Sequence, residues 1–357
     1  MSHLILHIGH PKTGTTALQT VLSANKRQLL AAGVLYPTRT TPKSYNHLPA
    51  LPYLTARESR ALKRRTGLSG EELGALSHRY WRSLEEEVQA SPHQTLVLSA
   101  ESFWGVSRSR APSFRDRLRS VCDTVKVVAY LRSPARRFLS QTNQNVRMFR
   151  APTLPPALYF EPVIKAYRAD GFEHMSLNVF ESSSLLQGDV VTDFCAKYLP
   201  PTLPPLDRST SEKGNESVSS EALVILGDLA AQQLSASPDT LARRRADVVE
   251  YLRAVDAELD GNLRPVLKAG IAEALVARSL DLPWLRDQCG VLFEDVDYDL
   301  VGTSGHVDLN GLHRVEDFCV IDSDRLAALR GRTKREIARI MGAEHTVRRL
   351  IRRLVGG

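Results

Sequence analysis

The sequence has few cysteines and no long apolar run. Its four cysteines, Cys122, Cys195, Cys289 and Cys319, lie far apart and show neither Cys-x-x-Cys nor Cys/His spacing. This distribution argues against a disulfide framework and against a zinc site. No stretch approaches the roughly 18 consecutive apolar residues that a membrane-spanning helix needs. We therefore expect a reduced protein that does not span a membrane and has no structural metal.

The first residues also lack the basic n-region, apolar h-region and cleavage site of a secretory signal. Together with the cysteine pattern, this predicts a cytoplasmic location. With 357 residues and 43% hydrophobic content, the chain can bury one large core, or one core and a helical subdomain. No internal repeat is evident, and the oligomeric state is left open.

Excess positive charge is confined to one part of the chain. The formal net charge is +7, from 47 basic and 40 acidic residues. Nine basic residues stand against two acidic ones between residues 330 and 353, so the rest of the chain has equal numbers of each sign. The nine are Arg330, Arg332, Lys334, Arg335, Arg339, Arg348, Arg349, Arg352 and Arg353.

An apolar stripe accompanies these charges, formed by Ile337, Ile340, Val347, Leu350, Ile351 and Leu354. The segment is interpreted either as a basic amphipathic helix on anionic lipid or an acidic glycan, giving a peripheral membrane contact, or as a terminal helix docked on the protein. The docked helix is favoured. Specific nucleic-acid binding has little support because no aromatic residues are interleaved with the charges.

A glycine-rich turn follows an apolar segment at residues 4–8 and precedes a helical pattern, which is how an anion-binding loop is built. Gly9 and Gly14 keep the G-x-x-x-x-G frame of a Walker A loop. Lys12, however, precedes the second glycine, and Thr15 occupies the position of the Walker lysine. Backbone N–H groups of residues 13–16, two hydroxyls and one ammonium can hold a tetrahedral anion.

A second strand-to-helix site follows residues 125–131, whose aliphatic and β-branched composition predicts a buried parallel strand. Arg132 ends this strand, Pro134 suits the first turn of a helix, and Ser140 lies eight positions after Arg132. An arginine can bind phosphate through two parallel N–H bonds, and a serine just over two turns into the helix can add a hydroxyl from the same side.

Residues 11–16, Pro-Lys-Thr-Gly-Thr-Thr, resemble the 5′-phosphosulfate loop of sulfotransferases that use 3′-phosphoadenosine 5′-phosphosulfate (PAPS), and Arg132 with Ser140 resembles their 3′-phosphate motif. Weaker similarity to bacterial carbohydrate-type sulfotransferases extends through residues 25–37, His47, and residues 99–102 and 176–199. Residues 213–217 loosely match the loop that closes over the nucleotide in that family.

The resemblance implies transfer of a sulfuryl group from PAPS to a hydroxyl or amine of an acceptor, without a metal, leaving adenosine 3′,5′-bisphosphate. A saccharide or glycan-bearing small molecule as acceptor is implied by the resemblance alone. Lys12 would neutralise charge at the bridging oxygen. The nucleotide-binding residues implied are Pro11, Lys12, Thr13, Gly14, Thr15, Thr16, Arg132, Ser140, Lys213 and Asn215.

A neutral acceptor also needs a base, and two residues are candidates. Glu101 follows a predicted strand, where apolar Phe103 and Trp104 beside it in sequence would raise its pKa. His47 follows the second predicted strand and is about as well suited to ordering the cleft or binding the acceptor. Glu101 is slightly favoured.

Two other functions stay open. A P-loop kinase or NTPase is disfavoured by the displaced lysine and by the lack of an obvious apolar strand ending in aspartate for Mg²⁺. A non-catalytic nucleotide-binding scaffold is opposed by the complete set of Lys12, Arg132 and Ser140.

The predicted fold class is α/β, a P-loop-type parallel sheet flanked by helices, with a largely helical C-terminal part. The PAPS-binding core is expected over residues 1–218, and a helical region that completes or caps the same domain over residues 219–357. Predicted strands cover residues 4–8, 33–36, 95–99, 125–131 and 177–180. Predicted helices cover residues 15–31, 70–90, 189–199, 221–233, 240–260 and 265–278.

Overall fold

The computed structural model describes residues 2–37, 48–150, 152–168, 172, 174–209, 217–232, 238–261 and 263–342. The chain forms two compact units, each assembled from three separate segments. The first unit contains Met1–Ser133, Pro156–Gly214 and Ser279–Val301, and the second contains Pro134–Pro155, Asn215–Arg278 and Gly302–Gly357. The boundary expected after residue 218 falls close to the start of the middle segment of the second unit.

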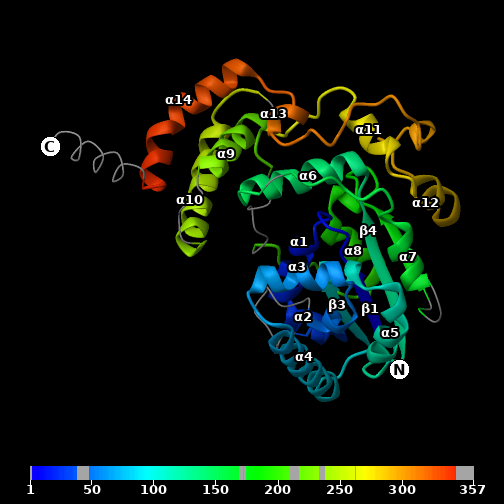
Figure 1. Ribbon diagram of the computed structural model, residues 1–357. Coiled ribbons are helices and arrows are strands. Elements are labelled where there is room, and N and C mark those ends of the chain that lie inside the picture. Colours follow the sequence, from blue (N-terminus) through cyan, green and yellow to red (C-terminus); the bar gives the residue numbers. More distant parts are fainter. Residues whose placement is uncertain are drawn as a thin grey trace. The chain divides into compact units, whose positions relative to one another are not determined.

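A five-stranded parallel sheet lies at the centre of the first unit, in the strand order β2-β3-β1-β4-β5 (Figure 1). The strands are β1 (His3–Ile8), β2 (Val34–Leu35), β3 (Thr95–Ala100), β4 (Thr124–Leu131) and β5 (His174–Val179). Strands β1, β3 and β4 are buried along almost their whole length, as their mainly apolar composition predicts for a sheet covered on both faces. The expectation of an α/β fold with a parallel sheet is confirmed.

The strand register aligns the carboxyl ends at one edge of the sheet. Ile8 of β1 pairs with Ala100 of β3, and Leu131 of β4 pairs with Val179 of β5. Because all strands are parallel, the residues that follow each of them gather at the same edge. This edge therefore receives the loop after β1, the turn after β3 that begins at Glu101, and Arg132 after β4.

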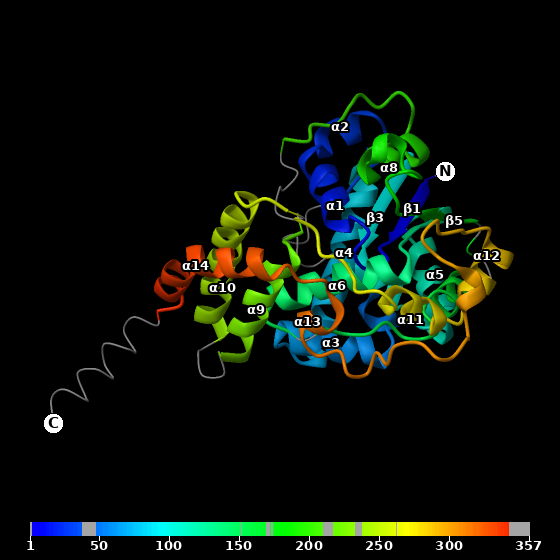
Figure 2. The same cartoon turned by 90° about the horizontal axis from the view of Figure 1, so that it is seen from above.

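The helices of the first unit are α1 (Thr15–Ala24), α2 (Lys26–Ala31), α3 (Ala56–Thr66), α4 (Gly70–Ala90), α5 (Ala111–Arg119), α7 (Glu161–Arg168), α8 (Val190–Tyr198) and α12 (Leu282–Cys289). Helices α1, α2 and α8 pack on one face of the sheet, where Val21 and Phe194 share a core with Ile5, Val97 and Val128 (Figure 2). Helix α1, which begins directly after the glycine-rich loop, is thus anchored on the sheet by its apolar side.

The second unit is built from α6 (Pro134–Arg147), α9 (Ser220–Gln232), α10 (Pro238–Ala257), α11 (Ile271–Ala277), α13 (Val315–Phe318) and α14 (Ser323–Ile340). Helices α9, α10 and α14 lie side by side in both views (Figures 1 and 2). Its own core contains Phe138 of α6, Leu226 of α9, Leu252 of α10 and Phe318 of α13.

The described part of the basic tail is docked. Helix α14 buries Leu329 and Ile337 in the core of the second unit, and its Arg330 pairs with Asp228 at 2.6 Å. This arrangement agrees with the docked interpretation for residues up to 342, whereas residues 343–357 lie outside the described part of the chain. Among the described helices, none combines the length and hydropathy needed to cross a bilayer.

Candidate functional site

The loop between β1 and α1 has an unusual backbone. Lys12 has a φ of 71° and Gly14 a φ of 75°, so two left-handed residues flank Thr13. The left-handed conformation costs a non-glycine residue roughly 1–2 kcal/mol. Such residues persist only where surrounding contacts hold them, and they concentrate at functional sites. Turns that include left-handed residues direct successive N–H groups into one concavity, which suits an anion.

Three hydrogen bonds hold this loop in place. The Thr13 hydroxyl donates to the carbonyl oxygen of His10 at 2.6 Å, and the Gly9 N–H donates to the carbonyl oxygen of Ala100 at 3.1 Å. Nη1 of Arg132 donates to the carbonyl oxygen of Lys12 at 2.9 Å. Thr13 is fully buried, and its hydroxyl is used to close the loop.

Both glycines of the frame are required by their surroundings. A Cβ on Gly14 would lie 2.7 Å from Cγ1 of Val190, and a Cβ on Gly9 would lie 2.4 Å from Oγ1 of Thr15. Gly14 also has a positive φ, which a larger residue adopts only with strain. The G-x-x-x-x-G spacing thus reflects close packing of the loop against α8 and against the start of α1.

The first residues of α1 present hydroxyls at the helix N-terminus. Thr15 is 2% exposed, and its Oγ1 has no hydrogen-bond partner within the part of the chain that the structure describes. An unsatisfied buried hydroxyl costs about 1–3 kcal/mol, which a ligand oxygen would recover. Thr16 is exposed, and the first turn of α1 carries no acidic residue. The positive end of the helix dipole is therefore not neutralised by side chains of α1 itself.

Arg132 lies against the loop from the end of β4. Its guanidinium carbon is 5.4 Å from the centre of the Phe180 ring, in addition to the bond to the Lys12 carbonyl. Ser140, the predicted partner of Arg132 at a phosphate, is half-buried in α6 and belongs to the second unit. The joint role of these two residues stays a prediction.

Glu101 is brought to the loop by the pairing of β3 with β1. It begins the 3-10 helix η3 (Glu101–Gly105), and its Cγ lies 3.2 Å from where a Cβ on Gly9 would be. Glu101 is exposed, whereas Phe103 and Trp104 are buried. The raised pKa expected for Glu101 stays a prediction.

Three of the predicted site residues, His47, Lys213 and Asn215, lie outside the described residues. Pro11 is half-buried next to Lys12, which is itself half-buried. Of the predicted set, the structure therefore brings together the loop residues 11–16, Glu101 and Arg132 at one edge of the sheet.

Several aromatic residues at this edge, Tyr159, Phe160 and Phe180 among them, were not predicted to belong to the site. His10 is fully buried, with its ring edge-on to Trp104 at 4.8 Å and to Tyr159 at 5.0 Å, and stacked on Phe160 at 5.5 Å. Phe180 supports Arg132 on one side and approaches Gly14 on the other. His10 follows the predicted strand 4–8 by two residues and Phe180 ends the predicted strand 177–180, whereas Tyr159 and Phe160 follow no predicted strand closely, so no sequence signal pointed to them.

His7 of β1 lies fully buried below the loop. Its Nδ1 is 2.8 Å from Oγ of Ser99, and its ring meets those of Tyr130 and Phe194 edge-on. Burial lowers the pKa of His7 from 6.5 to about 4. The imidazole is therefore neutral in the folded protein at physiological pH.

This burial makes a testable contribution to acid sensitivity. Below pH 6.5 the unfolded chain protonates His7 while the folded chain does not, so stability is lost as the pH falls from 6.5 to about 4. Between pH 7 and pH 5 the loss from this group is about 2 kcal/mol. Urea unfolding at both pH values should show a shallower pH dependence for His7→Asn than for the wild type. The same pH dependence of stability in both proteins would contradict the lowered pKa of His7.

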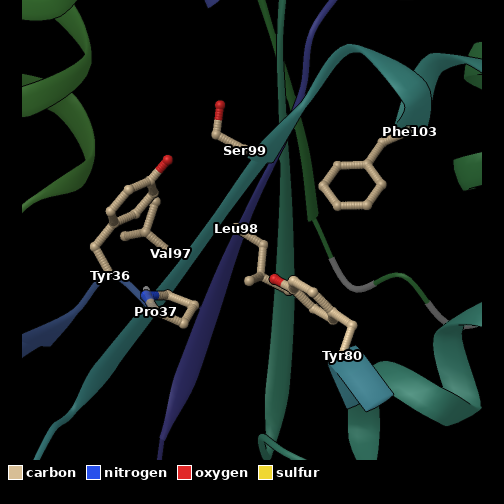
Figure 3. A pocket seen from close by; sticks show the side chains of 7 residues that line it. All are labelled: Tyr36, Pro37, Tyr80, Val97, Leu98, Ser99 and Phe103. Carbon is tan, nitrogen blue, oxygen red and sulfur yellow. The ribbon is translucent and has the colours of Figure 1, made fainter. Parts of the chain in front are cut away.

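A small cavity lies beside Ser99, deeper in the sheet. Its volume is about 10 Å³, and its lining residues are Tyr36, Pro37, Tyr80, Val97, Leu98, Ser99 and Phe103 (Figure 3). The hydroxyls of Tyr36 and Ser99 point toward the same region in Figure 3. A single water needs about 10–15 Å³, so this space is far too small for an acceptor molecule.

Within the described residues, no group of three or more His, Cys, Asp or Glu side chains is arranged to hold a metal ion. Neither the protein-family models nor the curated proteins include a match to the chain. What the protein does must therefore be inferred from its own residues.

Proposed function

We propose that the protein is a PAPS-dependent sulfotransferase with a P-loop-type core. It would transfer a sulfuryl group to a hydroxyl or amine of an acceptor, for which a saccharide or glycan-bearing molecule is the class implied by the sequence resemblance. The observation that carries the proposal is the loop after β1, in which a strained Lys12 precedes a helix N-terminus with a buried Thr15 hydroxyl that has no hydrogen-bond partner among the described residues.

We assign residues of the loop after β1, with Arg132 and Ser140, to the two charged ends of PAPS. The N–H groups at the start of α1 and the Thr15 and Thr16 hydroxyls would hold the 5′-phosphosulfate. Arg132, with Ser140, would hold the 3′-phosphate that distinguishes PAPS from ATP. A guanidinium has five N–H donors in a planar fork. Arg132 could therefore donate to the Lys12 carbonyl and to a phosphate at the same time.

Bound PAPS supplies the sulfuryl group, and the bond between sulfur and the bridging phosphate oxygen breaks as the bond to the acceptor oxygen or nitrogen forms. Lys12 would stabilise the negative charge that builds on the departing phosphate, which is the main electrostatic demand of such in-line transfers. Left-handed backbone at Lys12 fixes where its side chain leaves the loop. Lys12 thus acts on charge rather than as a proton carrier.

Glu101 would accept the acceptor's proton. Its position beside Gly9 places a carboxylate next to the loop, and its exposure leaves room for a hydroxyl to approach. Its help would come from position, because a general base must lie within hydrogen-bond reach of the proton that it accepts. His47 stays the second candidate for this role.

A thermal-shift comparison tests the nucleotide site. Adenosine 3′,5′-bisphosphate should raise the melting temperature of the protein, whereas Mg-ATP and adenosine 5′-monophosphate should raise it much less, because a ligand that binds only the folded state stabilises it. A shift with Mg-ATP alone would favour the kinase, and no shift with any of the three would remove the nucleotide site and leave a scaffold that does not bind these nucleotides. A positive result leads to a screen of mono- and disaccharides with sulfur-labelled PAPS.

Thr15→Val sharpens this test. The variant removes a buried hydroxyl that has no partner in the described structure, so folding should be unaffected or slightly improved. Bisphosphate affinity should nevertheless fall about tenfold, the loss of roughly one charge-assisted hydrogen bond. Thr20→Val, a buried threonine on the same helix, is the matched control and should bind normally.

A further inference from the structure

A groove of about 530 Å³ crosses the second unit. It lies between the end of α6, one face of α9 and the segment around the start of α13. Its lining residues are Val146, Phe149, Arg150, Pro152, Val224, Gly227, Asp228, Ala230, Ala231, His313, Arg314, Val315 and Glu316. The volume lies within the range of small-molecule sites, and the lining is mainly apolar with a few charged groups, as in such sites.

The floor of the groove is a stripe of mostly small residues on α9. Val224, Gly227, Asp228 and Ala231 follow the i, i+3, i+4, i+7 spacing of one helix face. Gly227 lies inside the helix, where glycine is unfavourable, and neither a positive φ nor a close neighbour requires it. An added Cβ there would meet nothing within 4 Å. Because Gly227 has no side chain, it keeps the groove wide at this point.

Phe149 forms part of the wall in a strained conformation. It has a φ of 55° and takes the left-handed position after α6 that glycine usually occupies, with the Arg150 N–H donating to the Asn145 carbonyl at 2.8 Å. The residue in this strained backbone conformation, Phe149, is thus an aromatic one that lines the groove. Phe149 and Arg150 are consecutive residues, and both line the groove.

The charged side chains of the groove differ in how many oppositely charged partners they have. Asp228 pairs with Arg330 at 2.6 Å and with Arg314 at 3.7 Å, and Arg314 also pairs with Glu316 at 2.6 Å. Arg150, by contrast, has no carboxylate partner among the described residues. Burial lowers the pKa of Arg245, and the charge of nearby Arg150 lowers it further, so a second cation adjoins the first. The unmatched charge at this rim is positive.

We propose that this groove binds a small organic anion, with an apolar ring against Phe149 and the small residues of α9 and an acidic group on Arg150. Aryl or alicyclic carboxylates, sulfate esters and phosphate esters share this chemistry. The site lies wholly in the second unit and does not depend on the function proposed for the first.

Two fluorescent probes with the same ring test the proposal: 4-methylumbelliferyl sulfate and uncharged 4-methylumbelliferone. Equilibrium dialysis against the full chain, with and without adenosine 3′,5′-bisphosphate, should show at least tenfold tighter binding of the sulfate in both conditions. Equal affinities, no binding of the sulfate up to millimolar concentration, or loss of its binding when the bisphosphate is added would overturn the proposal.

Two variants locate the site. Gly227→Leu should abolish binding of both probes without loss of thermal stability, because leucine favours the helix and its side chain enters open space. Arg150→Ala should reduce sulfate affinity about tenfold, to that of the uncharged probe. Arg335→Ala, which removes an exposed arginine of α14 outside the groove, should change neither. Unchanged sulfate binding in Gly227→Leu would place the probe elsewhere and refute the assignment.

Discussion

Lys12→Ala is expected to lower the turnover of sulfuryl transfer by about 10²–10³-fold, the effect of removing one preorganised charge stabiliser from a reaction centre. The expectation depends on the proposed function. Because the loop is held by the Thr13, Gly9 and Arg132 hydrogen bonds, none of which uses the Lys12 side chain, its shape should survive the substitution. Nucleotide affinity should therefore fall much less than turnover.

Lys12→Gly separates the charge of the residue from its backbone strain. Glycine adopts a φ of 71° without penalty, so this variant should be more stable than the wild type by about 1 kcal/mol. Its turnover should nevertheless be as low as that of Lys12→Ala. The measurement is label transfer to the best acceptor of the saccharide screen, with the exposed Lys334→Ala as control. Wild-type turnover in either loop variant would remove Lys12 from the chemistry.

The sheet and the loop could be predicted because their signals are local. Each predicted strand overlaps an observed one, and the helix expected over residues 70–90 is α4 with the same bounds. The helix expected over residues 15–31 is divided at Asn25, whose side chain bonds to Val21 and to Asp207. That division depends on a partner 182 residues away, which periodicity cannot reveal.

Other features of the site depended on three-dimensional context. The spacing of Lys12 and Gly14 indicated an anion loop, but it did not reveal the left-handed backbone at Lys12 or the hydrogen bond from Arg132 to the Lys12 carbonyl. The alternation of the two units along the chain had no compositional signal, because α6 follows β4 without a linker. The carbonyl of Lys12 and the guanidinium of Arg132 meet across 120 residues.

The second unit also contains contacts between residues far apart in the sequence, in a buried ion-pair network around Arg325. Nη1 of Arg325 lies 3.0 Å from Oε2 of Glu221 and 2.7 Å from Oδ1 of Asp256, and all three side chains are at most 6% exposed. Its Nη2 and Nε donate to the carbonyl oxygens of Asp256 and Asp260, both at 2.9 Å. The carboxylates in turn accept N–H bonds from Ser219 and Asp322. Each of the three charged side chains of the network thus has both an ion-pair partner and a hydrogen bond to the backbone.

Arg325→Met should therefore reduce the free energy of unfolding by about 3–5 kcal/mol, because two buried carboxylates lose their cation. The methionine fills similar volume, so the loss should reflect charge more than a cavity. Arg332→Met on the same helix removes an exposed pair at 3.8 Å and should cost under about 1 kcal/mol.

Urea unfolding measures both effects, and hydrogen exchange in α9 and α14 should locate the larger one. Adding Glu221→Gln and Asp256→Asn to Arg325→Met should restore part of the stability, since no buried charge then stays unpaired. An Arg325→Met protein as stable as the Arg332→Met control would mean that the network contributes nothing beyond an exposed ion pair. Further loss on adding the two amide substitutions would show instead that the carboxylates stabilise the unit through their N–H bonds to Ser219 and Asp322.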